Sequence, residues 1–266
     1  MILKKNTIDF TLITNLVFAF FPISFILGNL IINLNILLFC GLGIFHLRSK
    51  IFKIKYEYPI KIIFLFFFII FFSTSLSFAK TLYFDGYSSI NLVSSCYDTN
   101  CLSPLNRFAK SILFFRFFLF LLIIYLLNKF NILQYQYFFL VTALSSLLLS
   151  LDIIYQYIFG FNIIGLKSYG FTNSGFFGNE YIAGGYIQRF AFFTILFTIL
   201  VFKNKNYIKF IATAVVVIIL GAGILFSGNR MPLILFIFGL FLLLIFDLKI
   251  KKILIVSLVV FFISLK

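Results

Sequence analysis

Residues 62–79 read IIFLFFFIIFFSTSLSFA, a stretch without a charged residue that is long enough to cross a membrane as a helix. A transmembrane helix needs about 20 consecutive, mostly apolar residues. The whole chain shares this character: 63% of its 266 residues are apolar, 11% are charged, and its mean hydropathy is +1.15. Water-soluble domains do not have such a composition. The sequence therefore predicts an all-α, polytopic transmembrane helix bundle and excludes a soluble fold.

Similar apolar runs recur along the chain and predict about nine spans in a single transmembrane domain, residues 1–266. The expected spans are residues 10–27, 30–46, 62–79, 110–127, 138–158, 182–202, 209–226, 231–246 and 253–265. The first run is separated from the second by Gly28 and Asn29, and no small-residue cleavage site follows it. It is therefore interpreted as a membrane span and not as a cleaved signal peptide.

Basic residues gather in alternate segments between these spans. One set of segments contains Lys4, Lys5, Arg48, Lys50, Lys53, Lys55, Lys61, Lys129, Lys203, Lys205, Lys209, Lys249, Lys251 and Lys252. The opposite set contains Lys80, Arg107, Lys110, Lys167, Arg189 and Arg230. Cytoplasmic segments of membrane proteins carry an excess of Lys and Arg. This distribution predicts a cytoplasmic N-terminus in a bacterial inner membrane, and it accounts for the net charge of +15 without a nucleic-acid partner.

Two segments on the expected outer side, residues 80–107 and 161–181, are longer than simple turns. The first contains Cys96 and Cys101, which could form a disulfide if the loop faces an oxidising compartment. The length and polarity of these loops indicate that any chemistry takes place at the outer face.

The sequence predicts neither a metal ion nor another cofactor. Apart from Asp98, no potential zinc ligand accompanies Cys96 and Cys101, and no GxxxxGK[ST] nucleotide loop is present. His46, the single histidine, begins a basic cytoplasmic segment and is interpreted as an interfacial residue.

The most informative stretch is GFTNSGFFGNEYIAGGYIQR, residues 170–189, where a glycine-rich outer loop meets the sixth span. Asn179 is a candidate N-cap for that span, and Glu180 would suit the first turn of the helix. Arg189 is expected inside the apolar region, where a charge at the centre of a helix costs about 2.5–3.5 kcal/mol. This cost could be offset by snorkelling, by an ion pair with Asp152, or by an anionic ligand.

A second stretch, FSGNRMP at residues 226–232, lies at the outer mouth between the seventh and eighth spans. Ser227 or Asn229 could cap the eighth helix, and Pro232 fits its first turn. A helix N-terminus beside Arg230 is suited to binding phosphate or diphosphate. The motif alone is weak evidence, and its value comes from Arg189 on the same side of the membrane.

Arg116 interrupts the apolar run of the fourth span. Such a residue is expected to face the bundle interior or a water-filled cavity. An ion pair with Asp152 and contact with a ligand phosphate are the two alternatives.

The pairing of GFFGNEYIAGGYIQR, residues 175–189, with LFSGNRMPL, residues 225–233, resembles the O-antigen ligase and O-antigen polymerase superfamily. The resemblance covers about residues 110–250. It implies a metal-independent inner-membrane glycosyltransferase that uses an undecaprenyl-diphosphate-linked glycan donor. The acceptor would be a glycan, the lipid A core or a protein. Arg189, Arg230 and Arg116 would bind the diphosphate, with Asn179, Glu180, Ser227 and Asn229 in support.

The sequence departs from the ligases in one respect. In these enzymes a large periplasmic loop supplies a histidine thought to act as the base, and this chain ends at Lys266, where that loop would begin. The resemblance therefore predicts a chain truncated before the loop, with an incomplete catalytic apparatus and an unidentified catalytic residue. Two alternative functions are a transporter or flippase for a lipid-linked sugar or small anion, and a structural membrane subunit without a site.

Overall fold

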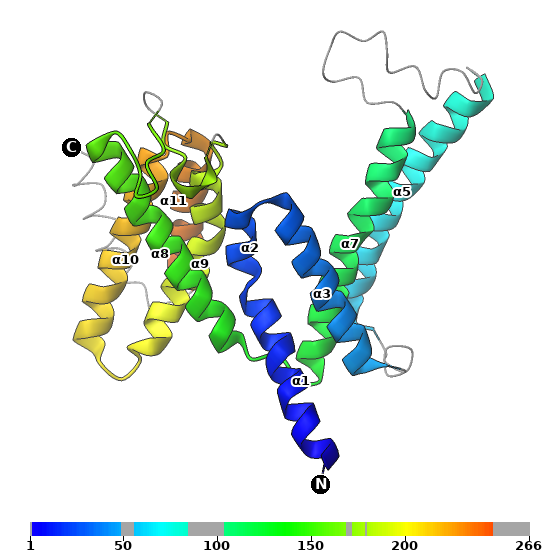
Figure 1. Ribbon diagram of the computed structural model, residues 1–266, viewed down its shortest axis with the longest axis horizontal. Coiled ribbons are helices and arrows are strands. Elements are labelled where there is room, and N and C mark those ends of the chain that lie inside the picture. The colour runs from blue at the N-terminus through cyan, green and yellow to red at the C-terminus, as the bar shows by residue number, and fades with distance from the viewer. Residues whose placement is uncertain (1, 49–55, 85–103, 169–171, 179, 247–266) are drawn as a thin grey trace. The chain divides into compact units, whose positions relative to one another are not determined.

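The computed structural model describes residues 2–48, 56–84, 104–168, 172–178 and 180–246 (Figure 1). Its elements are helices: α1 (Ile2–Ala19), α2 (Phe21–Leu27), α3 (Asn29–Leu47), α5 (Tyr58–Phe84), α7 (Pro104–Lys129), α8 (Tyr135–Phe159), the 3₁₀ helix η1 (Gly175–Phe177), α9 (Ala183–Val201), α10 (Asn206–Phe226) and α11 (Arg230–Phe246). Within these ranges, extended backbone pairs at one isolated bridge, between Phe161 and Lys167. The all-helical fold expected from the sequence is confirmed.

Six of the described helices are long and apolar enough to cross a membrane: α3, α5, α7, α8, α9 and α10. The pair α1 and α2 passes the same test as one bent span, and the apolar helix Arg230–Leu243 within α11 is shorter. The last expected span, residues 253–265, lies outside the described residues. These helices support a multi-pass membrane protein, and six to seven of the expected spans have a helix of sufficient length.

The first expected span, residues 10–27, is two helices that meet at a bend of 48°. Pro22 lies in the first turn of α2, where its missing N–H costs little. In a continuous helix the same proline would remove a backbone hydrogen bond and clash with the preceding turn. The proline therefore explains why the span breaks after Ala19.

The chain forms two compact units, which are described separately. Unit 1 comprises residues 1–35 and 134–266, and unit 2 comprises residues 36–133. In unit 1, α8 packs against α1, α2, α9 and α10, while α11 packs against α9 and α10 (Figure 1). Half of the membrane-spanning part of α8 is buried inside the protein. Helix α8 is therefore the central helix of this unit.

Small and hydroxyl-bearing residues allow the helices of unit 1 to approach closely. A Cβ added to Gly223 of α10 would lie 2.7 Å from Cβ of Ser150 on α8. The hydroxyls of Ser146 on α8 and Thr194 on α9 are 2.7 Å apart and fully buried. Close packing of small residues and interhelical hydrogen bonds is how helices associate in membranes, where lipid is as apolar as their side chains.

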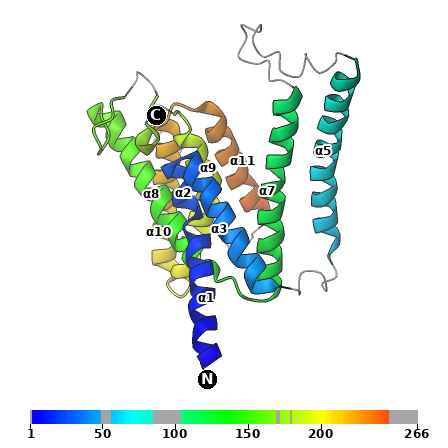
Figure 2. The ribbon, with the colours of Figure 1, turned by 45° about the vertical axis from the view of Figure 1, so that its right-hand side comes forward.

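Unit 2 contains the antiparallel pair α5 and α7, which lie side by side (Figure 2). Their interface is mainly aromatic: the rings of Phe67 and Phe114 stack with centroids 5.0 Å apart. One interhelical hydrogen bond joins Thr74 to Ser111, with oxygens 2.8 Å apart. Aromatic contacts thus dominate the α5–α7 interface, whereas in unit 1 aromatic contacts such as that of Phe18 with Phe138 are joined by close glycine and hydroxyl contacts.

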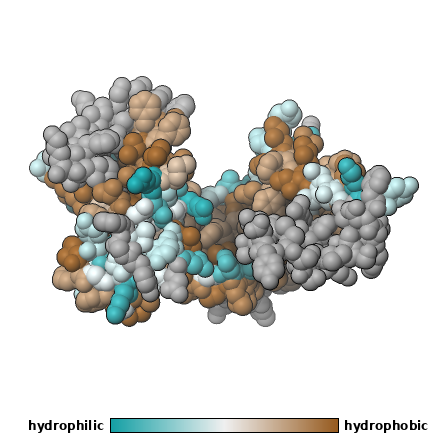
Figure 3. Space-filling view, turned by 90° about the horizontal axis from the view of Figure 1, so that it is seen from above, coloured by the Kyte–Doolittle hydropathy of each residue, from teal (hydrophilic) through white to brown (hydrophobic). Residues whose placement is uncertain are grey.

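Large apolar side chains remain exposed along the helices, including Leu30 at 76% and Leu37 at 71%. Figure 3 shows such side chains in brown over much of the visible surface, with polar side chains gathered among them. Apolar surfaces of this extent mark contact with other molecules, and on helices of this length the natural contact is lipid.

Candidate functional site

The segment between α8 and α9 is anchored on α8 by two buried side chains. Asp152 accepts a hydrogen bond from the backbone N–H of Ile163, at 3.0 Å. Gln156, one turn further along α8, accepts from the N–H of Gly175 at 2.9 Å and donates to the carbonyl of Leu166 at 3.3 Å. Both side chains are fully buried. Helix α8 therefore anchors the segment that joins it to α9.

Asn162 completes this anchor from within the loop. Its side chain donates to the carbonyl of Gly175 at 2.8 Å and accepts from the N–H of Leu166 at 2.7 Å. Gly175 has a φ of +55°, and an added Cβ would lie 2.8 Å from Leu149. Both its left-handed conformation and the lack of space require a glycine at this position.

A second set of contacts joins the loop to the turn between α10 and α11. The amide of Asn173 donates to the carbonyl of Phe226 at 2.7 Å, and that of Asn229 donates to the carbonyl of Tyr181 at 2.6 Å. Gly184, at the start of α9, packs directly against the Ser227 hydroxyl, and an added Cβ would lie 3.2 Å from Ser227 Cβ. Residues of the stretches 170–189 and 226–232 are therefore in direct contact.

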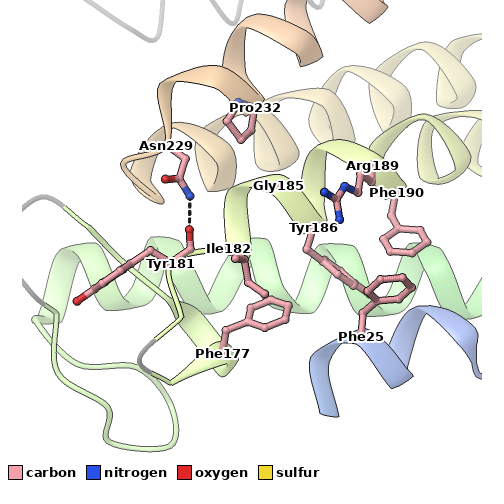
Figure 4. Close-up of a pocket in the computed structure, with 10 residues that line it drawn as sticks. All are labelled: Phe25, Phe177, Tyr181, Ile182, Gly185, Tyr186, Arg189, Phe190, Asn229 and Pro232. Carbon is pink, nitrogen blue, oxygen red and sulfur yellow. Dashed lines mark hydrogen bonds between the residues drawn. The ribbon is translucent and has the colours of Figure 1, made fainter. Parts of the chain in front are cut away.

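Arg189 lines a cavity of about 310 Å³ at this junction. Figure 4 shows Arg189 and Gly185 on α9, with Asn229 and Pro232 on the α11 side of the cavity. The Arg189 side chain is exposed, and it forms no ion pair with any described residue. Its guanidinium is therefore available to an anion entering the cavity.

The opposite wall of this cavity is aromatic. It consists of Phe177 of η1, Tyr186 and Phe190 of α9, and Phe25 of α2. The ring centroids of Tyr186 and Phe190 are 4.7 Å apart, and those of Phe25 and Phe190 are 5.9 Å apart. A cation beside an apolar aromatic wall suits a ligand that is anionic at one end and hydrocarbon at the other.

Tyr186 also ties the broken first span to this wall. Its hydroxyl oxygen is 3.0 Å from the carbonyl oxygen of Pro22 and 2.9 Å from the hydroxyl of Ser145. The position of α2, and with it Phe25, is thus fixed by a residue of the cavity itself.

Arg230 lies at a neighbouring cavity of about 390 Å³, which is lined mainly by Tyr157, Leu225, Phe226 and Leu233. Asn229 lines both cavities. The arginines of the two motifs therefore flank one asparagine but line different cavities. Arg230 is exposed and, like Arg189, has no carboxylate partner in the described part of the chain.

The structure corrects the helix-capping expectations. Helix α9 begins at Ala183, so Glu180 precedes the first helical turn and lies in a turn in which its N–H donates to the carbonyl of Phe177. Ser227 is the C-cap residue of α10, and its hydroxyl donates to the carbonyl of Ile224 and accepts from the N–H of Asn229 at 3.4 Å. Asn229 directly precedes α11, and Pro232 is in its first turn, as expected.

Arg189 and Asp152 do not form the ion pair that the sequence offered as one alternative. Asp152 is fully buried, and one carboxylate oxygen accepts the loop hydrogen bond while the other has no described partner. The carboxylate therefore organises the loop and leaves the arginine free.

Arg116 is in α7 of unit 2 and lines neither cavity. Its guanidinium lies 4.9 Å from the centroid of the Phe117 ring, and its buried Nε has no acceptor among the described residues. Its expected contact with a ligand phosphate stays a prediction. Asn179, Cys96 and Cys101 lie outside the described residues.

Sequence reasoning missed Gln156, Asn162, Asn173 and Tyr186. Asp152 and Gln156 are spaced i, i+4 on an otherwise apolar helix, which places them on one face. Two polar residues on one face of an apolar helix indicate that this face packs against polar groups of the protein and does not face lipid. Phe25 carried no comparable signal, because phenylalanines are abundant throughout the chain.

Comparisons with protein-family models, with curated proteins and with solved structures found no match to this chain. The groups of the site itself therefore carry the functional argument. No cluster of three or more His, Cys, Asp or Glu residues occurs in the described ranges.

Proposed function

We propose that this chain handles a polyprenyl-diphosphate-linked glycan at the outer face of a bacterial inner membrane, as a glycosyltransferase of the O-antigen ligase and polymerase type. In this proposal the N-terminus is cytoplasmic, about nine helices span the membrane, and the loop before α9 faces the periplasm. The observation that carries the proposal is the direct contact between the loop of residues 172–181 and the turn of residues 226–230, which places Arg189 at one cavity with an aromatic wall.

The chemistry of this cavity favours a lipid-linked anion over a small soluble one. A guanidinium binds phosphate oxygens through paired N–H donors. The wall of Phe25, Phe177 and Phe190 offers no hydrogen-bond partner and suits a prenyl chain. The volume of about 310 Å³ is at the lower end of the usual range for ligand sites, so the cavity would hold the diphosphate and its nearest isoprene unit.

In the proposed reaction, an acceptor hydroxyl attacks the anomeric carbon of the donor sugar and gives up its proton, which the departing diphosphate takes up. The bond from that carbon to the diphosphate oxygen breaks, and the diphosphate leaves with the bonding electrons. Arg189 would stabilise the negative charge that grows on the leaving group. Arg230, at the adjoining cavity, would bind a further anionic or polar part of the substrate.

A binding measurement with the purified chain in nanodiscs tests the proposal. With a fluorescent undecaprenyl diphosphate as the probe, Arg189→Ala should weaken binding by about tenfold or more, the loss expected for a charge-assisted hydrogen bond. Arg189→Lys should lose less, because it keeps the charge. Lys167→Ala, an exposed change in the same loop that lines neither cavity, should bind as the parent chain does. Equal binding by Arg189→Ala and the parent would contradict the proposal.

A transporter or flippase for a lipid-linked sugar is the second candidate, and one observation favours it. The break between α1 and α2 is adjacent to the cavity, which Phe25 of α2 lines. Transporters often build their substrate sites from broken helices. Movement of the labelled lipid between leaflets of vesicles, without transfer of its glycan to an acceptor, would support this second candidate.

A further inference from the structure

Unit 2 contains a groove that has no part in the site above. The groove lies between α5 and α7, has a volume of about 340 Å³, and is lined by Tyr56, Ile60, Lys61, Phe64, Phe118 and Leu122. Tyr56 precedes α5, and the other residues come from the start of α5 and the second half of α7, at one end of the antiparallel helix pair.

The groove is apolar, and Lys61 is the charged residue among those that line it. Ile60, Phe64, Phe118 and Leu122 form its walls, and the rings of Phe64 and Phe118 are 5.4 Å apart. Lys61, in the first turns of α5, is exposed and forms no ion pair within the described part of unit 2. Lys61 thus brings a positive charge to the edge of an apolar groove.

The nearest acidic residue in the sequence is already partnered. Glu57 lies 3.8 Å from the ammonium of Lys129, so its negative charge is balanced by a different lysine. In the sequence, residues 48–61 contain Arg48, Lys50, Lys53, Lys55 and Lys61 against Glu57 alone. The local charge therefore favours an anion beside Lys61.

Helix α5 leaves space for such a ligand. Only 6% of its membrane-spanning part is buried inside the protein, and it packs against α7. Phospholipid is the molecule that a bilayer supplies with an anionic head group at the interface and a hydrocarbon chain along the helix axis. Basic residues at the edge of a membrane attract anionic lipids by about 1 kcal/mol each.

We propose that this groove binds an anionic phospholipid, with one acyl chain between Phe64 and Phe118 and the phosphate at Lys61. The site is separate from the cavity of Arg189, and it requires only that α5 and α7 lie in a bilayer. Its occupant is distinguished from ordinary surrounding lipid by its charge.

The absence of tryptophan from the sequence allows a direct test. Phe118→Trp places a single fluorescent reporter in the groove, and Leu119→Trp places one at the same depth on α7, where residue 119 is 45% exposed and outside the groove. Phe64→Trp is a second groove reporter in case the Phe118 change disturbs folding. Each variant is reconstituted in phosphatidylcholine vesicles that contain a minor fraction of lipid with brominated chains, which quench tryptophan on contact.

Quenching of the groove reporter by brominated phosphatidylglycerol should correspond to an enrichment of this lipid in the groove by about fivefold. This is the enrichment expected from the attraction between one lysine and an anionic lipid. Brominated phosphatidylcholine at the same fraction should quench both reporters alike. Lys61→Ala should remove the excess quenching by phosphatidylglycerol, and high salt should reduce it by screening. Lys203→Ala, an exposed lysine of unit 1, should leave it unchanged.

Equal quenching of the groove and control reporters by phosphatidylglycerol would overturn the proposal, as would an excess that survives Lys61→Ala. Protection of the groove reporter from both brominated lipids would show that protein covers the groove, for instance a second copy of the chain, and would also overturn it.

Discussion

The two units of this protein solve the same packing problem with different residues. In unit 1, α8 is half buried and meets its neighbours through glycines, hydroxyls and a buried aspartate and glutamine. In unit 2, α5 is almost uncovered and meets α7 through phenylalanine rings. Polar groups inside a membrane protein are costly unless each finds a partner. The unit that contains the candidate site is thus the one whose packing requires particular partners.

The difference has a consequence for tolerance to mutation. Phenylalanine rings in contact contribute about 0.5–1.5 kcal/mol per pair beyond the burial of their surface, and neighbouring rings can adjust. Hydrogen-bonded loop anchors and glycine contacts cannot be replaced so easily. Substitutions of similar size should therefore cost more in unit 1 than at the α5–α7 interface of unit 2.

The largest effect is expected at Gly223 of α10. A Cβ there would lie 2.7 Å from Cβ of Ser150 and 2.9 Å from its Cα, which is backbone and cannot turn aside. Gly223→Leu should lower the free energy of unfolding by about 3 kcal/mol. Thermal unfolding in detergent, followed by circular dichroism, would measure the change. Gly185→Leu is the control, because no atom lies within 4 Å of a Cβ added at Gly185. Similar losses for both variants would contradict the close contact of α8 and α10.

A somewhat smaller effect is expected at Gln156. Gln156→Leu leaves the N–H of Gly175 without its acceptor, whereas the carbonyl of Leu166 keeps its hydrogen bond from the N–H of Asn162. A buried polar group left unpaired costs about 1–3 kcal/mol. The variant should also expose the loop of residues 160–182, which hydrogen exchange would detect as faster exchange at Gly175. Gln136→Leu, an exposed change on the same helix, should alter neither measurement. Unchanged exchange at Gly175 in Gln156→Leu would show that Asn162 and Asp152 hold the loop without it.

The sequence predicted the positions of the helices well, because uninterrupted apolar runs determine them. The expected spans 138–158 and 209–226 correspond to α8 (Tyr135–Phe159) and α10 (Asn206–Phe226). The break in the first span was missed, since Pro22 was read as part of one apolar run. Proline near a possible helix start permits both a continuous kinked span and two helices, and tertiary packing decides between them.

The site was predicted in part. The sequence indicated that residues 170–189 and 226–232 belong together, and they are in contact. The expected span 182–202 corresponds to α9 (Ala183–Val201). The sequence could not predict that Arg189 and Arg230 line different cavities, because the rotation of α9 and α11 about their axes is set by tertiary packing.

The smallest effects are expected when the hydrogen bond between two hydroxyls of neighbouring helices is removed, once in each unit. Ser146 and Thr194 in unit 1 are 2.7 Å apart and fully buried, while Thr74 and Ser111 in unit 2 are 2.8 Å apart and only partly buried. Hydrogen bonds between membrane helices contribute about 0.6 kcal/mol on average and up to about 1.7 kcal/mol. Double-mutant cycles of Thr74→Val with Ser111→Ala should give a coupling energy near that average, because lipid-facing side chains can rearrange around the lost bond. The cycle of Ser146→Ala with Thr194→Val should give a larger one, because both hydroxyls are fully buried and the one that remains keeps only the bond to a carbonyl of its own helix. Equal coupling in the two cycles would mean that burial does not distinguish the units, and the greater sensitivity of unit 1 would then rest on its glycine contacts and loop anchors alone.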